Sequence, residues 1–267
     1  MLTICVTHLK PLIPNHCFDV ELALGSYSES SDCHASALSK YWHDRRPIAY
    51  GAAGSYCIPI LIGKIGLPND GLIGINSYRK VLVKEPIGSP VVGEPNLTLI
   101  HPDAAQFIGP DNLRPRGNNQ FLVVRPLVYE KGTFAQYARA HKIIDLINYC
   151  SLAIDLGILN EKDVDSFFKC RYLIQGGAEF GVYPAEWLVP TLNCLELLGR
   201  TFLDRYGERV RDYDPYQVRS VGFLSERLGS FLLLKRLKRI YPQGIPGSLF
   251  GVIATVSNDG GYAVGRA

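Results

Sequence analysis

The sequence predicts an α/β fold in which a strand-rich half, residues 1–125, is followed by a helix-rich half, residues 132–240. Short apolar runs broken by Gly, Pro, Asn and Asp dominate the first half and are typical of strands. In the second half, apolar residues recur at helical spacing. Hydrophobic residues make up 47% of the 267 residues, enough for a substantial core. Because no linker separates the halves, we expect one domain over 1–267.

Four apolar runs in the first half predict strands, at 2–6, 71–75, 81–83 and 121–124. The stretch 86–120 carries several prolines and glycines with little periodicity, which predicts long loops of the kind that often cover a ligand site. Near the end of the chain, the apolar run 248–256 predicts one more strand.

Helical spacing predicts four helices in the second half: 134–156, one beginning near Asn160, 184–205 and 215–239. The last of these follows Asp212 and Asp214, which have the spacing of a metal-binding Asp-x-Asp pair. Asp214 precedes a proline and lies three residues before Gln217, a pattern typical of a helix N-terminus. We therefore interpret Asp214 as a cap and predict no metal site.

Composition and charge exclude several function classes. The chain has 28 Lys and Arg against 25 Asp and Glu, a net charge of +3 that is too slight to indicate nucleic-acid binding. No apolar run approaches the roughly 20 residues that cross a bilayer. The seven cysteines are scattered and form no Cys-x-x-Cys pair, so neither a disulfide framework nor a zinc cluster is expected. The first residues lack a secretion leader, and we expect a cytoplasmic protein.

Basic residues follow two of the predicted strands. Arg79 and Lys80 come after the run 71–75, and the carboxyl ends of strands in α/β sheets face the ligand crevice. They fit a clamp for a diphosphate, the alternative being a basic loop edge in water. His8 lies at the same end of the first strand, where it would contact a ligand or serve as a hydrogen-bonded structural residue.

Three polar side chains share one face of the predicted helix 134–156. Tyr137, His141 and Asp145 are spaced by four residues. His141 or Asp145 fits a catalytic base for a hydroxyl group, the alternative being a face that hydrogen-bonds to neighbouring strands. Glu179, on a Gly-rich loop, is a further acid candidate because such loops approach ligands closely.

The helix 215–239 presents two further patterns. Arg219, Gly222 and Glu226 share a face, so Arg219 fits a phosphate site oriented by Glu226, or an ion pair that locks the helix to the sheet. Downstream, the segment 228–239 alternates apolar and basic residues. Such a segment can rest on an anionic bilayer, although cations at a helix C-terminus also simply complement the helix dipole.

Five segments, at 4–10, 74–80, 136–146, 187–192 and 219–228, resemble in the same order the bacterial family labelled "domain of unknown function 4422", found among capsule and O-antigen glycosyltransferases. They include Gly74-Ile-Asn-Ser-Tyr78-Arg79-Lys80, which is similar to the family's Gly-x-x-His-Tyr-Arg-Arg. The chain departs from the family in two places. Ser77 stands where the family has His, and Gly51-Ala-Ala-Gly-Ser-Tyr56 replaces an aromatic segment.

The resemblance implies a Rossmann-like glycosyltransferase type A fold and a nucleotide-sugar donor. It suggests transfer of a hexose, with galactose in pyranose or furanose form as our hypothesis, from a UDP-sugar to a surface-polysaccharide acceptor. A lipid-linked acceptor would fit peripheral contact with the inner face of the cytoplasmic membrane. The candidate base is Asp145, His141 or Glu179. The candidate donor-binding residues are His8, Lys10, Tyr78, Arg79, Lys80, Arg219 and Glu226.

Because cationic side chains rather than an acidic pair follow the predicted strands, we expect no metal cofactor and weak or absent metal dependence. Two alternatives stay open. The missing Asp-x-Asp pair and Ser77 also fit a non-catalytic scaffold of a polysaccharide-assembly complex. A sugar-phosphate transferase on the same fold would release the nucleoside monophosphate instead of the diphosphate.

Overall fold

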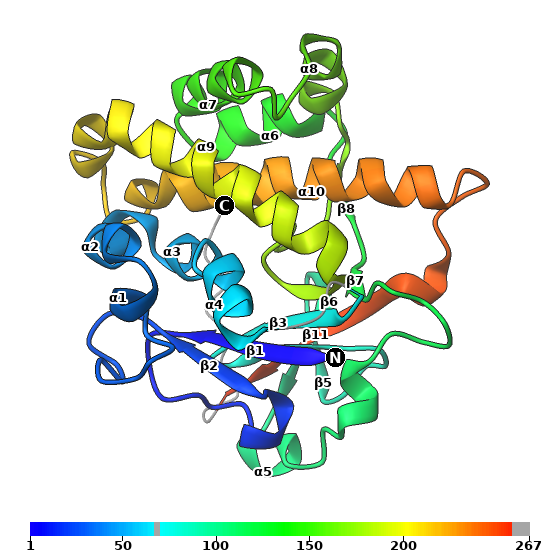
Figure 1. Ribbon diagram of the computed structural model, residues 1–267. Helices are drawn as coiled ribbons and strands as arrows, with labels where there is room; N and C mark the ends of the chain where they lie inside the picture. Colours follow the sequence, from blue (N-terminus) through cyan, green and yellow to red (C-terminus); the bar gives the residue numbers. More distant parts are fainter. Residues whose placement is uncertain (67–69, 258–267) are drawn as a thin grey trace.

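The computed structural model describes residues 1–66 and 70–257, and these contain a nine-stranded mixed sheet with helices (Figure 1). Its main path runs β2-β1-β3-β4-β11-β6-β5, with β10 added beside β3 and β7 beside β11. A separate two-stranded sheet pairs β8 (Leu127–Val128) with β9 (Tyr172–Leu173). The strands of the large sheet are β1 (Leu2–Thr7), β2 (Val20–Ala23), β3 (Leu72–Ser77), β4 (Lys80–Val83), β5 (Ser89–Val91), β6 (Glu94–Ile100), β7 (Val123–Val124), β10 (Gly181–Pro184) and β11 (Phe250–Val256).

The sheet brings two parallel strand ends together. β1 lies between β2 and β3 and is parallel to both, so the chain turns to opposite sides of β1 as it forms the two neighbours. In the β1–β3 register, Val6 pairs with Ser77 near the carboxyl end of each strand. A crevice at such a reversal of strand order is the usual ligand position in open α/β sheets.

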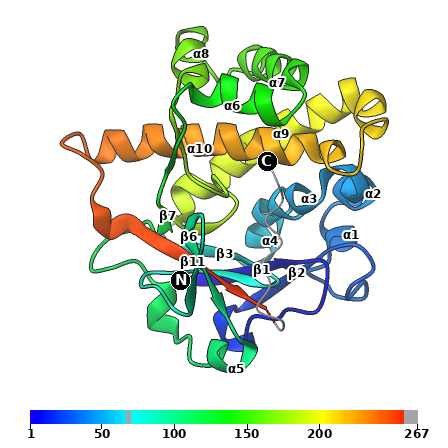
Figure 2. The same ribbon diagram turned by 180° about the vertical axis from the view of Figure 1, so that it is seen from behind.

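The helices form layers that both views show (Figures 1 and 2). Helices α2 to α4, α9 and α10 cover one side of the sheet, α6 to α8 lie beyond α9 and α10, and α5 lies on the opposite side. None of the described helices is long and apolar enough to cross a membrane. The bounds are α1 (Ala35–Leu38), α2 (Lys40–Ala49), α3 (Gly51–Ser55), α4 (Ile58–Ile65), α5 (Pro102–Ala105), α6 (Gly132–Ala140), α7 (Ile143–Asp155), α8 (Glu161–Phe168), α9 (Ala185–Arg211) and α10 (Ser220–Ile240).

Two cores flank the sheet. The alternation of side chains along each strand divides them: Leu82 of β4 belongs to the large core under the helices, while Val81 and Val83 belong to the smaller core on the other side. α3 packs unusually close to β1 because of Gly54. A Cβ at this position would lie 2.4 Å from Cγ1 of Val6. Glycine at 54 therefore allows α3 to reach the strand that borders the crevice.

The predicted α/β class with a helical second half is confirmed, and strands form at each predicted run. The first half, predicted to be strand-rich, does contain β1 to β7, but α1 to α4, which fill most of 35–65, were not predicted. Pro47 lies inside α2 and Gly54 inside α3. Because these residues usually interrupt helices, the sequence did not predict α2 and α3. The long-loop prediction for 86–120 was also wrong. This stretch contains β5, β6 and α5, and β6 pairs with β11 in the sheet.

The predicted helix 134–156 is two helices, α6 and α7, with a break at His141. The backbone of His141 is extended, with φ −141° and ψ 179°. Tyr137, His141 and Asp145 therefore do not share the face of one continuous helix. The predicted helix 215–239 begins as a short 3-10 turn, Gln217–Arg219, which continues into α10. The end of the predicted domain, 258–267, and the short stretch 67–69 lie outside the described residues.

Candidate functional site

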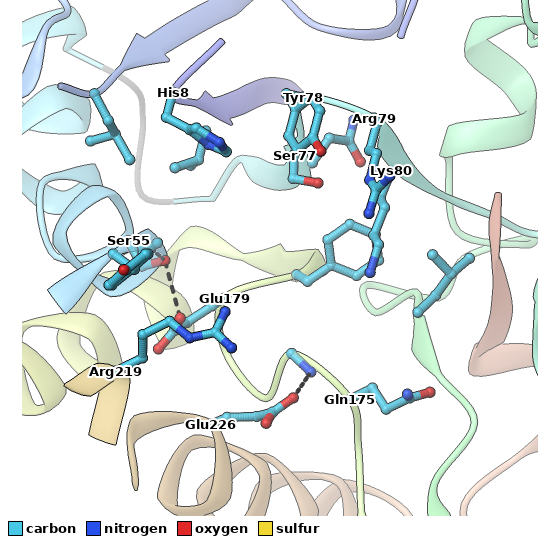
Figure 3. Close-up of a pocket in the computed structure, with 18 of the residues that line it drawn as sticks. His8, Ser55, Ser77, Tyr78, Arg79, Lys80, Gln175, Glu179, Arg219 and Glu226 are labelled. Atoms are coloured by element: carbon cyan, nitrogen blue, oxygen red, sulfur yellow. Dashed lines mark hydrogen bonds between the residues drawn. The ribbon is translucent and has the colours of Figure 1, made fainter. Parts of the chain in front are cut away.

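A pocket of about 560 Å³ opens at the carboxyl ends of β1 and β3, between the sheet and the helical layer (Figure 3). Strand-end residues form one side and residues of α2, α3, α10 and the loop before β10 form the other. The pocket thus occupies the crevice that the strand order creates. The lining residues are Val6, His8, Leu24, Arg46, Tyr50, Gly51, Ser55, Asn76, Ser77, Tyr78, Arg79, Lys80, Gln175, Gly176, Glu179, Phe180, Arg219, Glu226 and Ile253.

The strand side is built on the tight turn between β3 and β4. Ser77 pairs with Lys80, so Tyr78 and Arg79 form a two-residue hairpin turn. The backbone carbonyl of Tyr78 accepts hydrogen bonds from the amides of Leu12 (2.6 Å) and Ile13 (3.2 Å), and that of Arg79 accepts one from Val256 (2.7 Å). These bonds fix the turn, and the turn presents its polar side chains to the pocket.

His8 packs edge-to-face on the ring of Tyr78, with 5.2 Å between ring centroids. Partial burial and the positive charge of Arg46 lower the pKa of His8 below its ordinary value. The imidazole of His8 is therefore neutral at neutral pH, and it can donate or accept a hydrogen bond at the strand end.

Cationic side chains border the pocket on both sides. Arg79 and Lys80 lie on the strand side and Arg219 lies on the helix side (Figure 3). Arg46 lines the pocket from α2. The pocket also contains two carboxyl groups, those of Glu179 and Glu226. Four permanent cations beside two acids produce a lining suited to an anionic ligand.

Glu179 is the titratable group in the pocket with the most displaced pKa. Its Oε1 accepts a hydrogen bond from Ser225 Oγ (2.5 Å), and its Oε2 accepts one from Ser55 Oγ (3.3 Å). Removal from water, aided by the nearby charge of Glu226, raises the pKa of Glu179 to about 7 despite the two serine hydroxyls. A carboxyl group with a pKa near 7 that borders a cavity can exchange a proton with a ligand at neutral pH.

The loop that carries Glu179 is shaped by glycines and held by Glu226. Gly177 has φ +53°, and a Cβ there would lie 2.7 Å from the backbone oxygen of Glu226, so the loop sits directly on α10. The amide of Gly176 donates to Oε1 of Glu226 (2.8 Å), while Oε2 pairs with Nη1 of Arg227 (3.0 Å). Oε1 of Glu226 thus joins the loop to α10, while Oε2 is engaged by a neighbour on the same helix.

Seven of the ten predicted site residues line this one pocket: His8, Tyr78, Arg79, Lys80, Glu179, Arg219 and Glu226. Lys10 is exposed and is not among the lining residues, and neither are His141 and Asp145. The predicted orientation of Arg219 by Glu226 was wrong. No ion pair joins these two side chains among the described residues, since Glu226 pairs with its chain neighbour Arg227.

Asp145 is fully buried between helices. Its Oδ1 pairs with Nη2 of Arg209 (2.6 Å) and accepts a hydrogen bond from the hydroxyl of Tyr213 (3.2 Å). Burial nevertheless raises the pKa of Asp145 above its ordinary value, because the lost hydration outweighs the pairing. This carboxyl has protein partners on one oxygen and no opening to the pocket lining.

His141 is enclosed by aromatic rings and by an arginine. Its ring stacks on Phe223 (4.1 Å between centroids) and Tyr216 (5.8 Å), and Nη2 of Arg227 lies 3.2 Å from Nε2. Burial and the charge of Arg227 lower the pKa of His141 to about 4. The imidazole is therefore neutral over the physiological range.

Sequence reasoning missed several polar or aromatic residues of the lining, among them Arg46, Tyr50, Ser55 and Gln175. Three of them belong to α2, to α3 or to the junction between them, which were not predicted as helices. A signal did exist. The segment 51–56, where the chain departs from the family pattern, contributes Gly51 and Ser55 to the pocket.

The interpretation of Asp214 as a cap is confirmed. Its Oδ1 accepts hydrogen bonds from the amides of Tyr216 (2.8 Å) and Gln217 (3.0 Å) at the turn leading into α10. Within 1–66 and 70–257, no cluster of three or more His, Cys, Asp or Glu side chains has an arrangement suited to a metal ion.

Comparison with known proteins yields a structural match. No protein-family model matches the chain, and no curated protein does. The structure is similar to the apo structure of WbbM, described as a bifunctional glycosyltransferase, with a TM-score of 0.69 and 14% sequence identity. The match covers 96% of this chain and 45% of WbbM, so the chain spans about half the length of that protein. At this identity, the likeness establishes a shared fold.

Proposed function

We propose that the chain is a glycosyltransferase that moves a sugar from a nucleotide-sugar donor to a glycan acceptor. The observation that carries the proposal is the pocket itself, where the cations Arg79 and Lys80, at the turn between β3 and β4, lie across from a carboxyl group with a pKa near 7. The finer proposal is a hexose, galactose in pyranose or furanose form, carried by UDP. The glycosyltransferase description of the protein that shares the fold supports the coarser proposal. The family resemblance in the sequence supports a nucleotide-sugar donor.

In the proposed reaction, an acceptor hydroxyl oxygen forms a bond to the anomeric carbon, and the bond from that carbon to the β-phosphate oxygen breaks. The electron pair of the broken bond stays on the departing nucleoside diphosphate. Arg79 and Lys80 would stabilise its growing negative charge, since preorganised cations act most strongly on charge that develops in the transition state. His8 would add a neutral hydrogen-bonding group at the same strand end.

We assign the base role to Glu179 among the three candidates. The hydroxyl proton would pass to the Glu179 carboxylate, which is about half ionised near pH 7. Ser55 and Ser225 hold the two carboxylate oxygens, so the group is oriented before a ligand enters. His141 and Asp145 have no such access to the pocket lining, and they keep partners within the helical layer.

The test is to titrate the purified protein with UDP, GDP and dTDP, and then to follow cleavage of the matching sugar nucleotides with and without candidate acceptors. We expect one nucleoside diphosphate to bind and to be released as product. No binding of any nucleoside diphosphate would overturn the proposal. Release of the monophosphate would instead identify a sugar-phosphate transferase, and tight binding without turnover of any donor would favour the scaffold.

A further inference from the structure

We propose that Arg46, Tyr50 and Arg219 form a second anion-binding subsite on the helix side of the pocket, which takes a phosphate group of the acceptor. This inference rests on the proposed function, and it separates these residues from the strand-side cations that would hold the donor. It assigns Arg219 to the acceptor rather than to the donor. It also gives roles to Arg46 and Tyr50, which sequence reasoning did not single out.

The two arginines converge on one tyrosine ring. The guanidinium carbon of Arg219 lies 5.5 Å from the ring centroid of Tyr50, and that of Arg46 lies 6.0 Å from it. Arg46 comes from α2 and Arg219 from the turn that precedes α10, so elements far apart in the sequence bring the charges together. An anion bound by both guanidinium groups would offset the repulsion between their charges.

Most N–H donors of these two guanidinium groups have no acceptor within the described residues. A guanidinium carries five N–H donors. Among the described residues, Arg219 uses its Nε for the backbone oxygen of Tyr216 (3.4 Å), and the side chain of Arg46 makes no hydrogen bond. Neither the Arg46 nor the Arg219 side chain forms an ion pair with a carboxylate of residues 1–66 or 70–257. The flat fork of N–H groups that is left matches the oxygens of a phosphate.

Both guanidinium groups are nevertheless held in place. Arg219 packs on the rings of Tyr216 (4.9 Å) and Phe223 (5.4 Å). Arg46 lies over Gly25, where a Cβ would come within 3.4 Å of its guanidinium carbon and where φ is +69°. A cation that is positioned without a carboxylate partner loses less conformational entropy when it binds a ligand.

The conformation of Tyr50 is a second, independent observation. Its φ is +50° and its ψ is −125°, in a region that residues with a side chain rarely adopt. Helix ends on both sides hold it there, because its amide bonds to the Arg46 carbonyl and its carbonyl to the Ala53 amide. Strain of this kind tends to occur at ligand sites. Here the strained residue is one whose ring lies near both arginines and lines the pocket.

The position of Glu179 indicates that the acceptor uses this subsite. Figure 3 shows Arg219 beside Glu179 on the helix side, with Arg79 and Lys80 across the pocket. The acceptor hydroxyl must approach Glu179 to deliver its proton, whereas the diphosphate leaves toward the strand-side cations. An anionic group bound at Arg46 and Arg219 would therefore belong to the molecule that carries the hydroxyl.

The first experiment titrates inorganic pyrophosphate into protein saturated with UDP, using the wild type, Arg46→Gln and Arg219→Gln. Arg45→Gln is the matched control, because Arg45 lies on the same helix, pairs with Asp204 (3.1 Å) and does not line the pocket. We expect pyrophosphate to bind the UDP complex, and to bind each pocket variant about 10- to 100-fold more weakly, the usual effect of losing a charged hydrogen bond. The control should match the wild type.

Two results of this titration would overturn the subsite: absence of pyrophosphate binding to the UDP complex, or an equal loss of UDP affinity in both pocket variants. The latter would place both arginines in the donor site. If another nucleoside diphosphate binds the wild type in place of UDP, it takes the place of UDP in this titration. If none binds, the proposed function fails, and pyrophosphate alone then tests the subsite with the same variants. Pyrophosphate affinity of Tyr50→Gly measures the contribution of the Tyr50 side chain alone, since glycine accepts the positive φ without strain.

The second experiment separates the acceptor from other sources of phosphate. It compares KM for one saccharide acceptor prepared with an alkyl diphosphate and as the neutral alkyl glycoside. Arg46→Gln should raise KM for the phosphorylated acceptor about 10-fold or more and leave KM for the neutral one unchanged. Equal changes for both acceptors would contradict recognition of phosphate. A free alkyl diphosphate that competes with the acceptor, while neutral lipid does not, would identify the phosphate rather than the lipid as the recognised group.

Discussion

Two polar clusters among the described residues contain an ionisable group whose pKa burial displaces, and one of the two clusters lines the pocket at the strand ends. The pocket cluster consists of Arg46, Arg79, Lys80, Glu179 and Arg219. The interhelix cluster consists of His141, Asp145, Arg209, Tyr213 and Arg227. In the interhelix cluster the charges meet protein partners, as in the 2.6 Å pair of Asp145 with Arg209. In the pocket cluster the arginines of the helix side have no carboxylate partner among the described residues, and they face a space of about 560 Å³.

The comparison teaches that a displaced pKa marks burial, whereas function also requires access to a ligand. Burial is the largest cause of the pKa shift in both clusters, raising the pKa of Glu179 to about 7 and lowering that of His141 to about 4. The ring of His141 is covered by Phe223 and Tyr216. Glu179 shows part of its surface to the pocket. Mutations in the two clusters should therefore affect different measurements.

The largest effect should come from Glu179→Gln, which removes the proposed base while keeping the size of the side chain. We expect turnover to fall by about 10²- to 10⁴-fold, the usual contribution of general base catalysis. In the wild type, turnover should rise with pH through about 7 as the carboxyl ionises. Steady-state rates from pH 5.5 to 8.5 check both points. Glu208→Gln, at an exposed position outside the lining, is the control. Full activity of the Glu179 variant would show that Glu179 is not the base.

The Glu179→Gln variant should lose turnover but gain stability at alkaline pH. Folding raises the pKa of Glu179 from its usual 4.5 to about 7, so the folded state binds this proton more tightly than the unfolded state does. Its contribution to stability is complete below about pH 4.5 and is lost as the pH rises to about 7. Glu179→Gln should thus be about 2 kcal/mol more stable than the wild type at pH 8, with the difference vanishing near pH 4.5. Urea unfolding at the two pH values measures it.

Arg79→Ala should have the next largest effect. If Arg79 stabilises the departing diphosphate, turnover should fall by a factor that corresponds to about 3 to 4 kcal/mol, with little change in the unfolding midpoint. Lysine should restore only part of the activity, because it supplies charge without the two-pronged fork. Rates at saturating donor for Ala and Lys variants give the comparison, with Arg45→Ala as the control. A loss of about 1 kcal/mol of stability with unchanged turnover would show that Arg79 is only a surface ion-pair residue.

The sequence predicted the strand side of the pocket better than the helix side. His8, Arg79 and Lys80 follow apolar runs, and the rule that ligands bind at the carboxyl ends of parallel strands placed them correctly at the crevice. Arg46 and Tyr50 were not predicted as site residues, because α2 contains Pro47 and α3 consists of small residues, so neither helix was expected. In isolation these residues weaken a helix, and here tertiary packing against β1 stabilises it.

The interhelix cluster was misjudged for a different physical reason. The four-residue spacing of Tyr137, His141 and Asp145 implied one helix face, but the extended backbone at His141 divides that helix. Spacing shows which side chains share a face only while the helix continues. The assignment of Glu179 depended on a loop rather than on periodicity, and its two serine partners come from α3 and α10, which no local pattern could connect.

The interhelix cluster should respond in stability rather than in turnover. Arg209→Met removes the partner of a fully buried carboxylate, and we expect a loss of about 2 to 3 kcal/mol in the free energy of unfolding. Asp145→Asn should cost far less at neutral pH, because burial already raises the pKa of Asp145 and the neutral amide avoids that penalty. Chemical unfolding, with rates per folded molecule, tests both. A large loss of turnover in Asp145→Asn would restore Asp145 as a catalytic candidate. It would also contradict a purely structural role of the interhelix cluster.

The smallest effect concerns Asp214, at the edge of the interhelix cluster beside Tyr213. As a cap, Asp214 accepts two backbone hydrogen bonds, so Asp214→Ala should cost about 1 kcal/mol of stability and leave turnover unchanged. Asp212→Ala is the matched control, since Asp212 is exposed and its side chain makes no hydrogen bond within the described residues. Turnover should also persist after incubation with a chelator, because the proposed neutralising groups are Arg79 and Lys80. If the chelator abolished turnover, manganese restored it, and both alanine variants lost activity together, the two aspartates would form a metal site. The donor would then lie against the helical layer instead of the strand ends.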